Sequence, residues 1–153
     1  MATTIDVRWD DFEAAFFIGS PDARYFLNRD TGAVEYTSHM DGETVRERIL
    51  RQTKNEPWIE IPRVEPGTGI RELHQFTETV SDETHRNALL EALKTPRPLV
   101  SFNKALGADP AIRKQWKTAL MNGIHRRLLS FCVEHELRVD DERFRDIQQR
   151  LAS

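Results

Sequence analysis

Cysteine is nearly absent from this sequence, and long apolar runs are absent altogether. Cys132 is the only cysteine of the 153 residues, so no intrachain disulfide can form, whereas small domains of oxidising compartments commonly depend on such links. No stretch approaches the ~18 apolar residues of a membrane span. The first residues lack the basic region and the apolar run of a secretory signal. We therefore expect a soluble cytoplasmic protein that has no contact with membranes.

Signatures of catalysis and of metal binding are lacking as well. The sequence contains no G-x-S-x-G, no H-E-x-x-H and no C-x-x-C motif. Gly67-Thr68-Gly69 precedes an expected helix, whose N-terminus can hold an anion, but the Lys-Ser/Thr pair of a P-loop does not follow. We accordingly predict a protein that is not an enzyme and has no catalytic residue, no metal ligand and no cofactor.

Two residue pairs keep a catalytic alternative open. His74 and Glu78 are separated by one helical turn and can share a metal, but a catalytic zinc requires three protein ligands. Cys132 and His135 have the spacing of a thiolate pair, yet the apolar neighbours of Cys132 favour a buried, inert thiol. The remaining histidines, which we expect at the surface, are His39, His85 and His125.

The composition is that of a folded chain with a modest core. Hydrophobic residues make up 39% and charged residues 31% of the sequence, and eight phenylalanines and three tryptophans supply bulky core material. A chain of this length buries roughly 68–70% of the surface it exposes when unfolded. The sequence contains neither an internal repeat nor a linker long enough to separate two domains. We expect one domain over residues 1–153.

The first half predicts a short helix and a small antiparallel sheet. Asp10 to Ile18 carries apolar residues at helical spacing. The aromatic and β-branched runs 24–27 and 33–37 flank a loop with Asp30 and Gly32, which is typical of a hairpin. The segment 42–54 indicates a thin amphipathic helix or an ordered loop. Residues 58–62 alternate like a half-buried strand and end at a proline, so we place this strand beside the hairpin 24–37.

The second half predicts helices only. Apolar stripes run through 70–80 and 88–93, the second with Ser81 as its expected N-cap. A third helix carries Leu99, Phe102 and Leu106. Asp109 and Pro110 have the residue types of an N-cap and first helical position. They open the longest helix, whose apolar stripe is Ile112, Trp116, Leu120, Ile124, Leu128 and Phe131. The fold class is therefore α+β, with the helix and sheet packed against a helical C-terminal half.

Trp116 and the C-terminal segment lead to two further expectations. If Trp116 anchors the core, the substitution Trp116→Ala costs about 3–5 kcal/mol. Residues 138–153 predict a C-terminal helical extension that begins with Asp140 as its cap. Its narrow apolar seam of Phe144, Ile147 and Leu151 is suited either to the domain itself or to a second copy in a homo-oligomer.

The charges are unevenly distributed along the chain. Residues 1–80 contain 9 basic and 15 acidic residues, whereas residues 81–153 contain 13 basic and 10 acidic ones. Between Lys94 and Arg127, eight basic residues accompany the single acid Asp109. Such a segment attracts polyanions or acidic protein surfaces. The predicted binding residues are Lys104, Arg113, Lys114, Lys117 and Arg126.

On a helical wheel, these basic residues are spread over several sides of the helix. Arg113 and Lys117 lie on one side of the expected helix, Arg126 points well away from them, and Arg127 falls within the range of the apolar stripe. A solvated face that pairs with the acidic first half of the chain explains such a pattern, and so does an acidic protein partner. Nucleic-acid binding requires the basic residues to collect on one face.

Four segments resemble one known family. The runs YFLNRDTGAVEY, WIEIPRVE, ELHQFTETVSDETHRNALLEALK and FNKALGADPAIRKQWKTALMNGIHRRLLSF, within residues 23–137, are similar to the bacterial group termed uncharacterised protein family 0158. The resemblance implies a small bacterial α+β protein, and the family has no established activity. In the family pattern a basic and aromatic stretch precedes Phe102, whereas here Leu99-Val100-Ser101 stands there. This difference weakens the nucleic-acid hypothesis.

Three hypotheses of function follow. The first is a non-enzymatic protein-interaction module that binds an unidentified partner through Arg113, Lys114, Lys117 and Arg126. The second is a nucleic-acid-binding protein that uses the basic segment 94–127, including Lys104. The third is a hydrolase of unknown substrate that uses His74 and Glu78.

Overall fold

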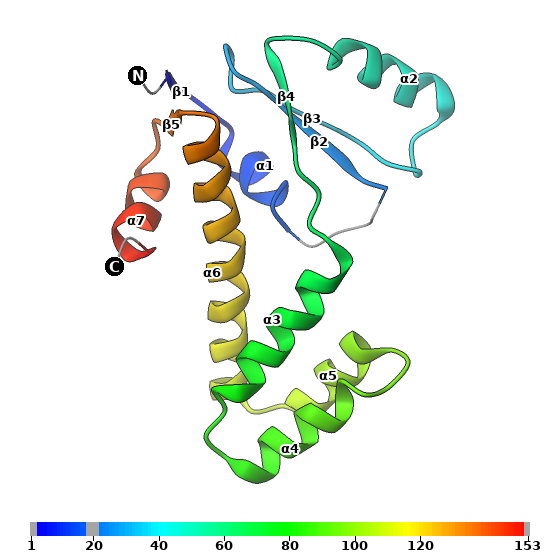
Figure 1. Cartoon of the computed structure of the whole chain (residues 1–153), viewed down its shortest axis with the longest axis vertical. Coiled ribbons are helices and arrows are strands. Elements are labelled where there is room, and N and C mark those ends of the chain that lie inside the picture. Colours follow the sequence, from blue (N-terminus) through cyan, green and yellow to red (C-terminus); the bar gives the residue numbers. More distant parts are fainter. Residues whose placement is uncertain (1–2, 18–21, 152–153) are drawn as a thin grey trace. The chain divides into compact units, whose positions relative to one another are not determined.

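The computed structural model describes residues 3–17 and 22–151. Within these ranges it contains seven helices and five short strands, which confirms the α+β class and the helical second half (Figure 1). The contacts divide the chain into two compact units. Unit 1 comprises Met1–Val64 and Ile124–Ser153, and unit 2 comprises Glu65–Gly123. Each unit has its own buried residues. The expectation of a single domain stays a prediction.

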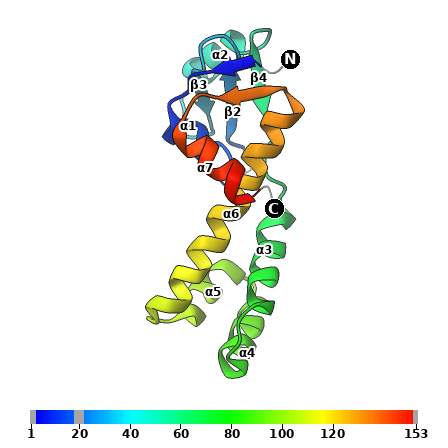
Figure 2. The same cartoon turned by 90° about the vertical axis from the view of Figure 1, so that its left-hand side faces the viewer.

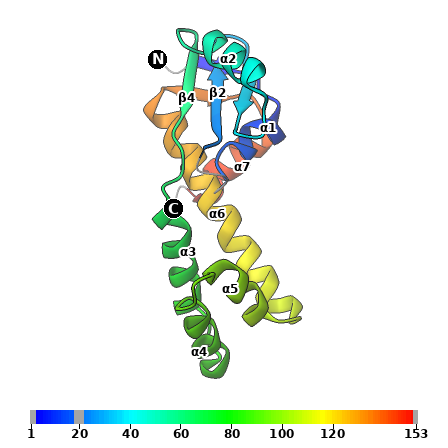
Figure 3. The same ribbon diagram turned by 90° about the vertical axis from the view of Figure 1, so that its right-hand side faces the viewer.

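A three-stranded antiparallel sheet forms the centre of unit 1. Strand β2 (Arg24–Asn28) pairs on one side with β3 (Val34–Thr37) and on the other with β4 (Trp58–Ile61), and Figure 3 shows β2 and β4 side by side. The predicted hairpin and the predicted neighbouring strand are both confirmed. Both faces of β2 are buried, because the neighbouring residues Phe26 and Leu27 point to opposite faces of the sheet and both are buried.

Gly32 explains why the hairpin loop can close. Its φ of 77° lies in the left-handed region that glycine adopts without steric cost. A Cβ at this position would meet the carbonyl oxygen of Asp6 at 1.5 Å. The close approach of the Asp6 backbone therefore also requires a glycine here. The Asn28 Oδ1 atom accepts hydrogen bonds from the N–H groups of Asp30 and Thr31, which fixes the turn.

Two helices accompany this sheet. Helix α1 (Trp9–Ala14) buries Trp9 and Phe12; it ends earlier than the predicted 10–18, and Ile18 lies outside the described residues. The segment 42–54 forms a helix, α2 (Glu43–Gln52), which packs against β3 and buries Ile49. The alternative of an ordered loop at this segment is wrong.

Unit 1 also contains a parallel strand pair that the sequence did not predict. Strand β1 (Thr3–Ile5) pairs in register with β5 (Leu137–Val139) (Figure 2). The helix α7 (Glu142–Leu151) follows β5, so the predicted C-terminal helix exists but begins after a strand. Its first N–H groups are capped by Asp141, whose Oδ1 accepts from the N–H of Arg143 at 2.8 Å. The prediction of Asp140 as the cap is therefore wrong by one residue.

The apolar seam of α7 is used within the chain. Phe144 and Ile147 are each only 2% exposed, and Leu151 is half-buried. Arg143 also lies over the ring of Trp9, 5.5 Å from its centroid. Two of the three side chains proposed for a homo-oligomer contact are thus already buried within the chain, and the homo-oligomer stays a prediction.

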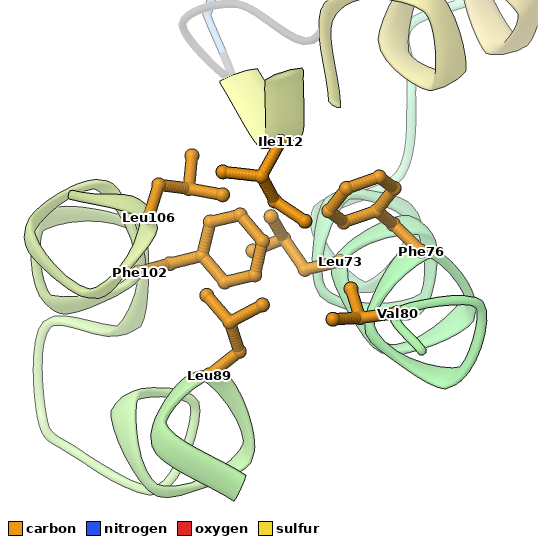
Figure 4. Close-up of a cluster of buried hydrophobic side chains, with 7 residues drawn as sticks. All are labelled: Leu73, Phe76, Val80, Leu89, Phe102, Leu106 and Ile112. Atoms are coloured by element: carbon orange, nitrogen blue, oxygen red, sulfur yellow. The ribbon is translucent and has the colours of Figure 1, made fainter. Parts of the chain in front are cut away.

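Unit 2 consists of helices around a small aromatic and aliphatic core. The helices are α3 (Pro66–Glu78), α4 (Glu83–Ala92), α5 (Pro98–Leu106) and the first part of α6 (Pro110–Glu134). Seven buried side chains converge, as Figure 4 shows, six from these four helices and Val80 from the segment after α3. They are Leu73, Phe76, Val80, Leu89, Phe102, Leu106 and Ile112.

Four details of unit 2 correct the sequence predictions. The N-cap of α4 is Asp82 rather than Ser81, because the Asp82 side chain accepts from the N–H of His85. Leu99 is 56% exposed rather than part of the core. Trp116 is half-buried and packs against the cluster from its edge. Residues 67–69 lie inside the first turn of α3, since this helix begins at Pro66, so they form no loop ahead of it.

The long helix α6 begins as predicted. The Asp109 Oδ1 atom accepts from the N–H of Ala111 at 2.9 Å, and Pro110 occupies the first helical position. The helix continues for 25 residues, and the boundary between the two units falls after its residue Gly123. Within the described part of the chain, no helix has both the length and the apolar character needed to cross a membrane.

Candidate functional site

The five predicted binding residues are all exposed, but they do not form one cluster. Lys104 lies in the last turn of α5, and Arg113, Lys114 and Lys117 lie in the first turns of α6. Arg126 belongs to the part of α6 that is assigned to unit 1. The other four residues belong to unit 2.

Arg113 has a structural task. Its Nε–H donates to the carbonyl oxygen of Gly107, and its Nη2 donates to that of Asn103 at 3.2 Å. The last carbonyl groups of a helix have no partner within the helix, so Arg113 caps the C-terminal end of α5. Two of its five N–H donors are therefore used within unit 2, and we leave Arg113 out of the proposed binding surface.

Lys114 lines a hollow between α3 and α6 within unit 2. The hollow has a volume of about 450 Å³. Phe76 and Thr79 contribute from α3, and five residues contribute from α6. These five are Lys114, Gln115, Thr118, Ala119 and Asn122. We call this hollow the α3–α6 groove.

The groove has an apolar floor and polar sides. Phe76 is buried and contacts the Trp116 ring at a centroid distance of 5.2 Å, so the floor is continuous with the aromatic core of unit 2. Ala119 packs against the same core. Threonine and glutamine side chains around this floor offer hydrogen-bond donors and acceptors. Such a combination of apolar floor and convergent polar groups is typical of ligand-binding surfaces.

Three exposed lysines of unit 2 form no ion pair with the residues that the structure describes. In the described residues, no acidic side chain pairs with Lys104, Lys114 or Lys117. Lys114 and Lys117 are three residues apart on α6, so they are neighbours on its surface. By contrast, Lys94 pairs with Glu91 at 3.1 Å. The groove therefore has positive charge at its α6 side that the neighbouring chain does not neutralise.

The basic residues of α6 in unit 1 behave differently. Arg127 donates from Nε to the carbonyl oxygen of Phe16 at 3.0 Å, which agrees with its predicted position within the apolar stripe. Arg126 is exposed. No described residue of the α3–α6 groove belongs to this part of the helix, so Arg126 is not part of the groove.

His125 is the clearest error of the surface prediction. This histidine is 8% exposed and lies between two side chains that the sequence alone gave no reason to bring together. Its Nδ1 accepts from Arg150 at 2.9 Å, so its Nε2 carries the proton and donates to Glu13 at 2.8 Å. Trp9 donates to the same Glu13 oxygen at 3.2 Å. The quartet joins α1, α6 and α7 and has no open nitrogen for catalysis.

The other predicted chemical groups find no catalytic setting. His74 and Glu78 are exposed on α3, and no group of three potential metal ligands exists among the described residues. Cys132 is buried, as predicted, and burial raises the pKa of its thiol to about 12. The His85 Nε2–H donates to the carbonyl oxygen of Ala105 at 3.0 Å, so this ring links α4 to α5.

Sequence reasoning found the lysines of the groove but not the groove. One signal in the sequence could have indicated the groove. Small and polar residues lie on one face of α6, beside its apolar stripe; they are Gln115, Thr118, Ala119 and Asn122. Comparison with protein-family models, with curated proteins and with solved structures returned no match to this chain. The resemblance to uncharacterised protein family 0158 therefore stays a prediction.

Proposed function

We propose that this chain is a cytoplasmic, non-enzymatic protein-interaction module that binds an acidic segment of a partner protein in the α3–α6 groove. The observation that supports the proposal is the position of Lys114. It is an exposed lysine without an acidic partner among the described residues, and it lines a hollow whose floor is apolar. An acidic segment with apolar side chains matches both properties.

The dimensions and chemistry favour a helical segment. Grooves between helices commonly receive an amphipathic helix, whose apolar side chains enter the groove while its charged residues meet the rim. Phe76 and Ala119 supply the apolar contact, and Lys114 supplies a positive charge within the lining. Lys117, three residues further along α6, adds a second positive charge outside the lining. Rim charges of this kind chiefly raise the association rate and select the partner, since they are screened by salt.

The other hypotheses receive less support. Nucleic-acid binding needs basic side chains gathered on one face, whereas Arg113 and Arg127 are bonded to backbone carbonyl groups and Arg126 lies outside the groove. A hydrolase needs an assembled set of catalytic groups, and neither His74 nor Glu78 has such neighbours in the described structure. We therefore keep nucleic-acid binding only as an outcome of the test below, and we do not propose a hydrolase.

The test is a selection of short random peptides displayed on phage against the purified full chain. Wild-type protein should enrich peptides that combine acidic and apolar residues. The double variant Lys114→Glu, Lys117→Glu should not enrich these peptides. Its affinity for synthetic copies of the enriched peptides should be lower by about tenfold or more, because two attractive charges become repulsive. Lys104→Glu is the matched control, because this lysine is equally exposed but does not line the groove.

Two results would contradict the proposal. The first is a selection that yields no common acidic motif. The second is an equal loss of binding in Lys104→Glu together with a gel shift of a DNA or RNA oligonucleotide that weakens steeply with salt, because that pattern is the signature of phosphate contacts.

A further inference from the structure

Unit 1 contains a second hollow whose walls are largely aromatic. Its volume is about 120 Å³, roughly the room for one ring. Phe17, Tyr25 and Tyr36 contribute the three aromatic rings. The remaining described residues of the lining are small or aliphatic except for Arg63; they are Ala14, Ala15, Ala23, Ile61, Pro62 and Val64. We call this the tyrosine hollow.

The sheet holds the two tyrosines together. Tyr25 of β2 and Tyr36 of β3 are direct partners in the antiparallel register, and their ring centroids are 4.9 Å apart. Such cross-strand aromatic pairs are well ordered because each ring restricts the other. Phe17 and Tyr36 are nevertheless 42% and 44% exposed. Two large exposed aromatic side chains around one concave site mark a recognition surface more than a solvated face.

The two hydroxyl groups differ. Tyr36 donates to Ser38 Oγ at 3.1 Å, whereas the Tyr25 hydroxyl makes no hydrogen bond with any described residue. Burial and the neighbouring Tyr36 raise the pKa of Tyr25, so this hydroxyl stays protonated at neutral pH. The hollow therefore combines aromatic walls with one available hydrogen-bond donor.

We propose that the tyrosine hollow binds a proline-rich segment of a partner protein, with one proline ring between Phe17 and the tyrosine pair and a backbone carbonyl of the segment accepting from Tyr25. A segment in the polyproline II conformation has no internal hydrogen bonds, so its carbonyl groups are free to accept. Aromatic grooves with a tyrosine donor are one of the recurring solutions for its recognition. The entropy lost on binding is small because the segment is already extended.

The charge of the site argues against one other ligand. A quaternary or methylated ammonium group, which also prefers aromatic cages, would lie beside the Arg63 guanidinium in the lining. A neutral ring meets no such repulsion. This site is separate from the α3–α6 groove, so its test does not depend on the function proposed above.

The experiment is a titration of the nitrogen-15-labelled full chain with decaproline, followed by two-dimensional NMR. We expect chemical-shift changes that saturate and that concentrate on Phe17, Tyr25 and Tyr36. Tyr36→Ala should reduce the affinity by about tenfold or more, and Tyr25→Phe should reduce it while leaving the ring pair in place. Val133→Ala is the control, since Val133 is also exposed but lies on α6 outside the hollow.

The outcome that overturns the proposal is equally direct. A glycine-serine peptide of the same length is the control ligand and should cause no such shifts. Equal shifts with both peptides would refute the proposal, and so would the absence of shifts at the three aromatic residues with decaproline. Shifts at these residues with an oligouridylate but not with decaproline would assign the hollow to single-stranded nucleic acid instead. Unchanged affinity in Tyr36→Ala would place the binding site elsewhere.

Discussion

Phe102→Ala removes the side chain at the centre of the unit 2 core. Phe102 is 0% exposed, and its ring lies 6.3 Å from that of Phe76 and 5.4 Å from that of Trp116. Trp116 belongs to the same aromatic group but is half-buried. The structure therefore predicts an order of effects: truncation of Phe102 destabilises the protein more than truncation of Trp116.

The magnitudes follow from burial. Phe→Ala in a closed core costs about 3–5 kcal/mol, because the transfer free energy is lost and a cavity remains. Trp116 loses only part of its accessible surface on folding and keeps its ring contacts, each worth about 0.5–1.5 kcal/mol. We expect Trp116→Ala to cost about 2 kcal/mol, which is less than the 3–5 kcal/mol that follows from a fully buried anchor.

The assay is urea unfolding followed by far-ultraviolet circular dichroism, with the free energy of unfolding obtained by linear extrapolation. Phe102→Leu, which keeps most of the volume and should cost less than about 1.5 kcal/mol, remains measurable if Phe102→Ala does not fold. Leu99→Ala is the matched control on the same helix, since Leu99 is 56% exposed, and it should change the free energy by no more than about 0.5 kcal/mol.

Two results would refute the reasoning. One is a larger loss for Trp116→Ala than for Phe102→Ala, which would restore Trp116 as the anchor of the core. The other is a loss below about 1 kcal/mol for Phe102→Ala, which is too small for the truncation of a buried phenylalanine and would mean that the four helices do not enclose this ring.

The cap of α7 and the buried thiol give two further predictions. Asp141→Ala should cost about 1 kcal/mol in thermal unfolding because the cap is lost, whereas Asp140→Ala should change little; equal effects would contradict the assignment. The Cys132 thiol, with its raised pKa, stays protonated in the folded state while the unfolded thiol ionises near ~8.5. Raising the pH from ~7 to ~10 should therefore cost wild type about 2 kcal/mol more than Cys132→Ala, and parallel pH profiles would show that the thiol is accessible.

Local signals in the sequence were sufficient for most of the elements. The hairpin has its turn residues between two β-branched and aromatic runs, and the α6 N-terminus has Asp109 and Pro110 side by side, so both could be predicted without tertiary information. The cap of α7 was misplaced because Asp140 and Asp141 are adjacent. Only the hydrogen bond to Arg143 distinguishes them.

Features that depend on distant partners escaped prediction. The strands β1 and β5 contain three residues each, and Thr3 pairs with Leu137 across most of the chain, so neither strand has a periodic pattern of its own. The burial of His125 depends on Glu13, 112 residues away, and on Arg150. In the candidate site, the residue types of the lysines were visible, but the wall supplied by Phe76 and Thr79 of α3 was not.

Arg113 shows why a count of charges does not define a binding surface. A count along the sequence assigns every arginine one positive charge that is open to a partner, but an arginine also has five N–H donors. Arg113 uses donors on the open carbonyl groups of α5, and Arg127 uses one on Phe16. Lys114 and Lys117 form no ion pair with a described residue, and for this reason the proposed function assigns the binding of a partner to them.

The division of the chain between the two units has a consequence for its synthesis. Unit 2 is one uninterrupted stretch, Glu65–Gly123, so all of its core residues have been synthesised before residue 124 is added. Unit 1 has to wait, because β1 emerges first and its partner β5 ends only at Val139. At about 5–20 residues per second the interval is roughly 7–27 s. During that interval Trp9 and Phe12 lack the α7 and α6 residues, Arg143 and Phe131, that pack against them in the folded unit.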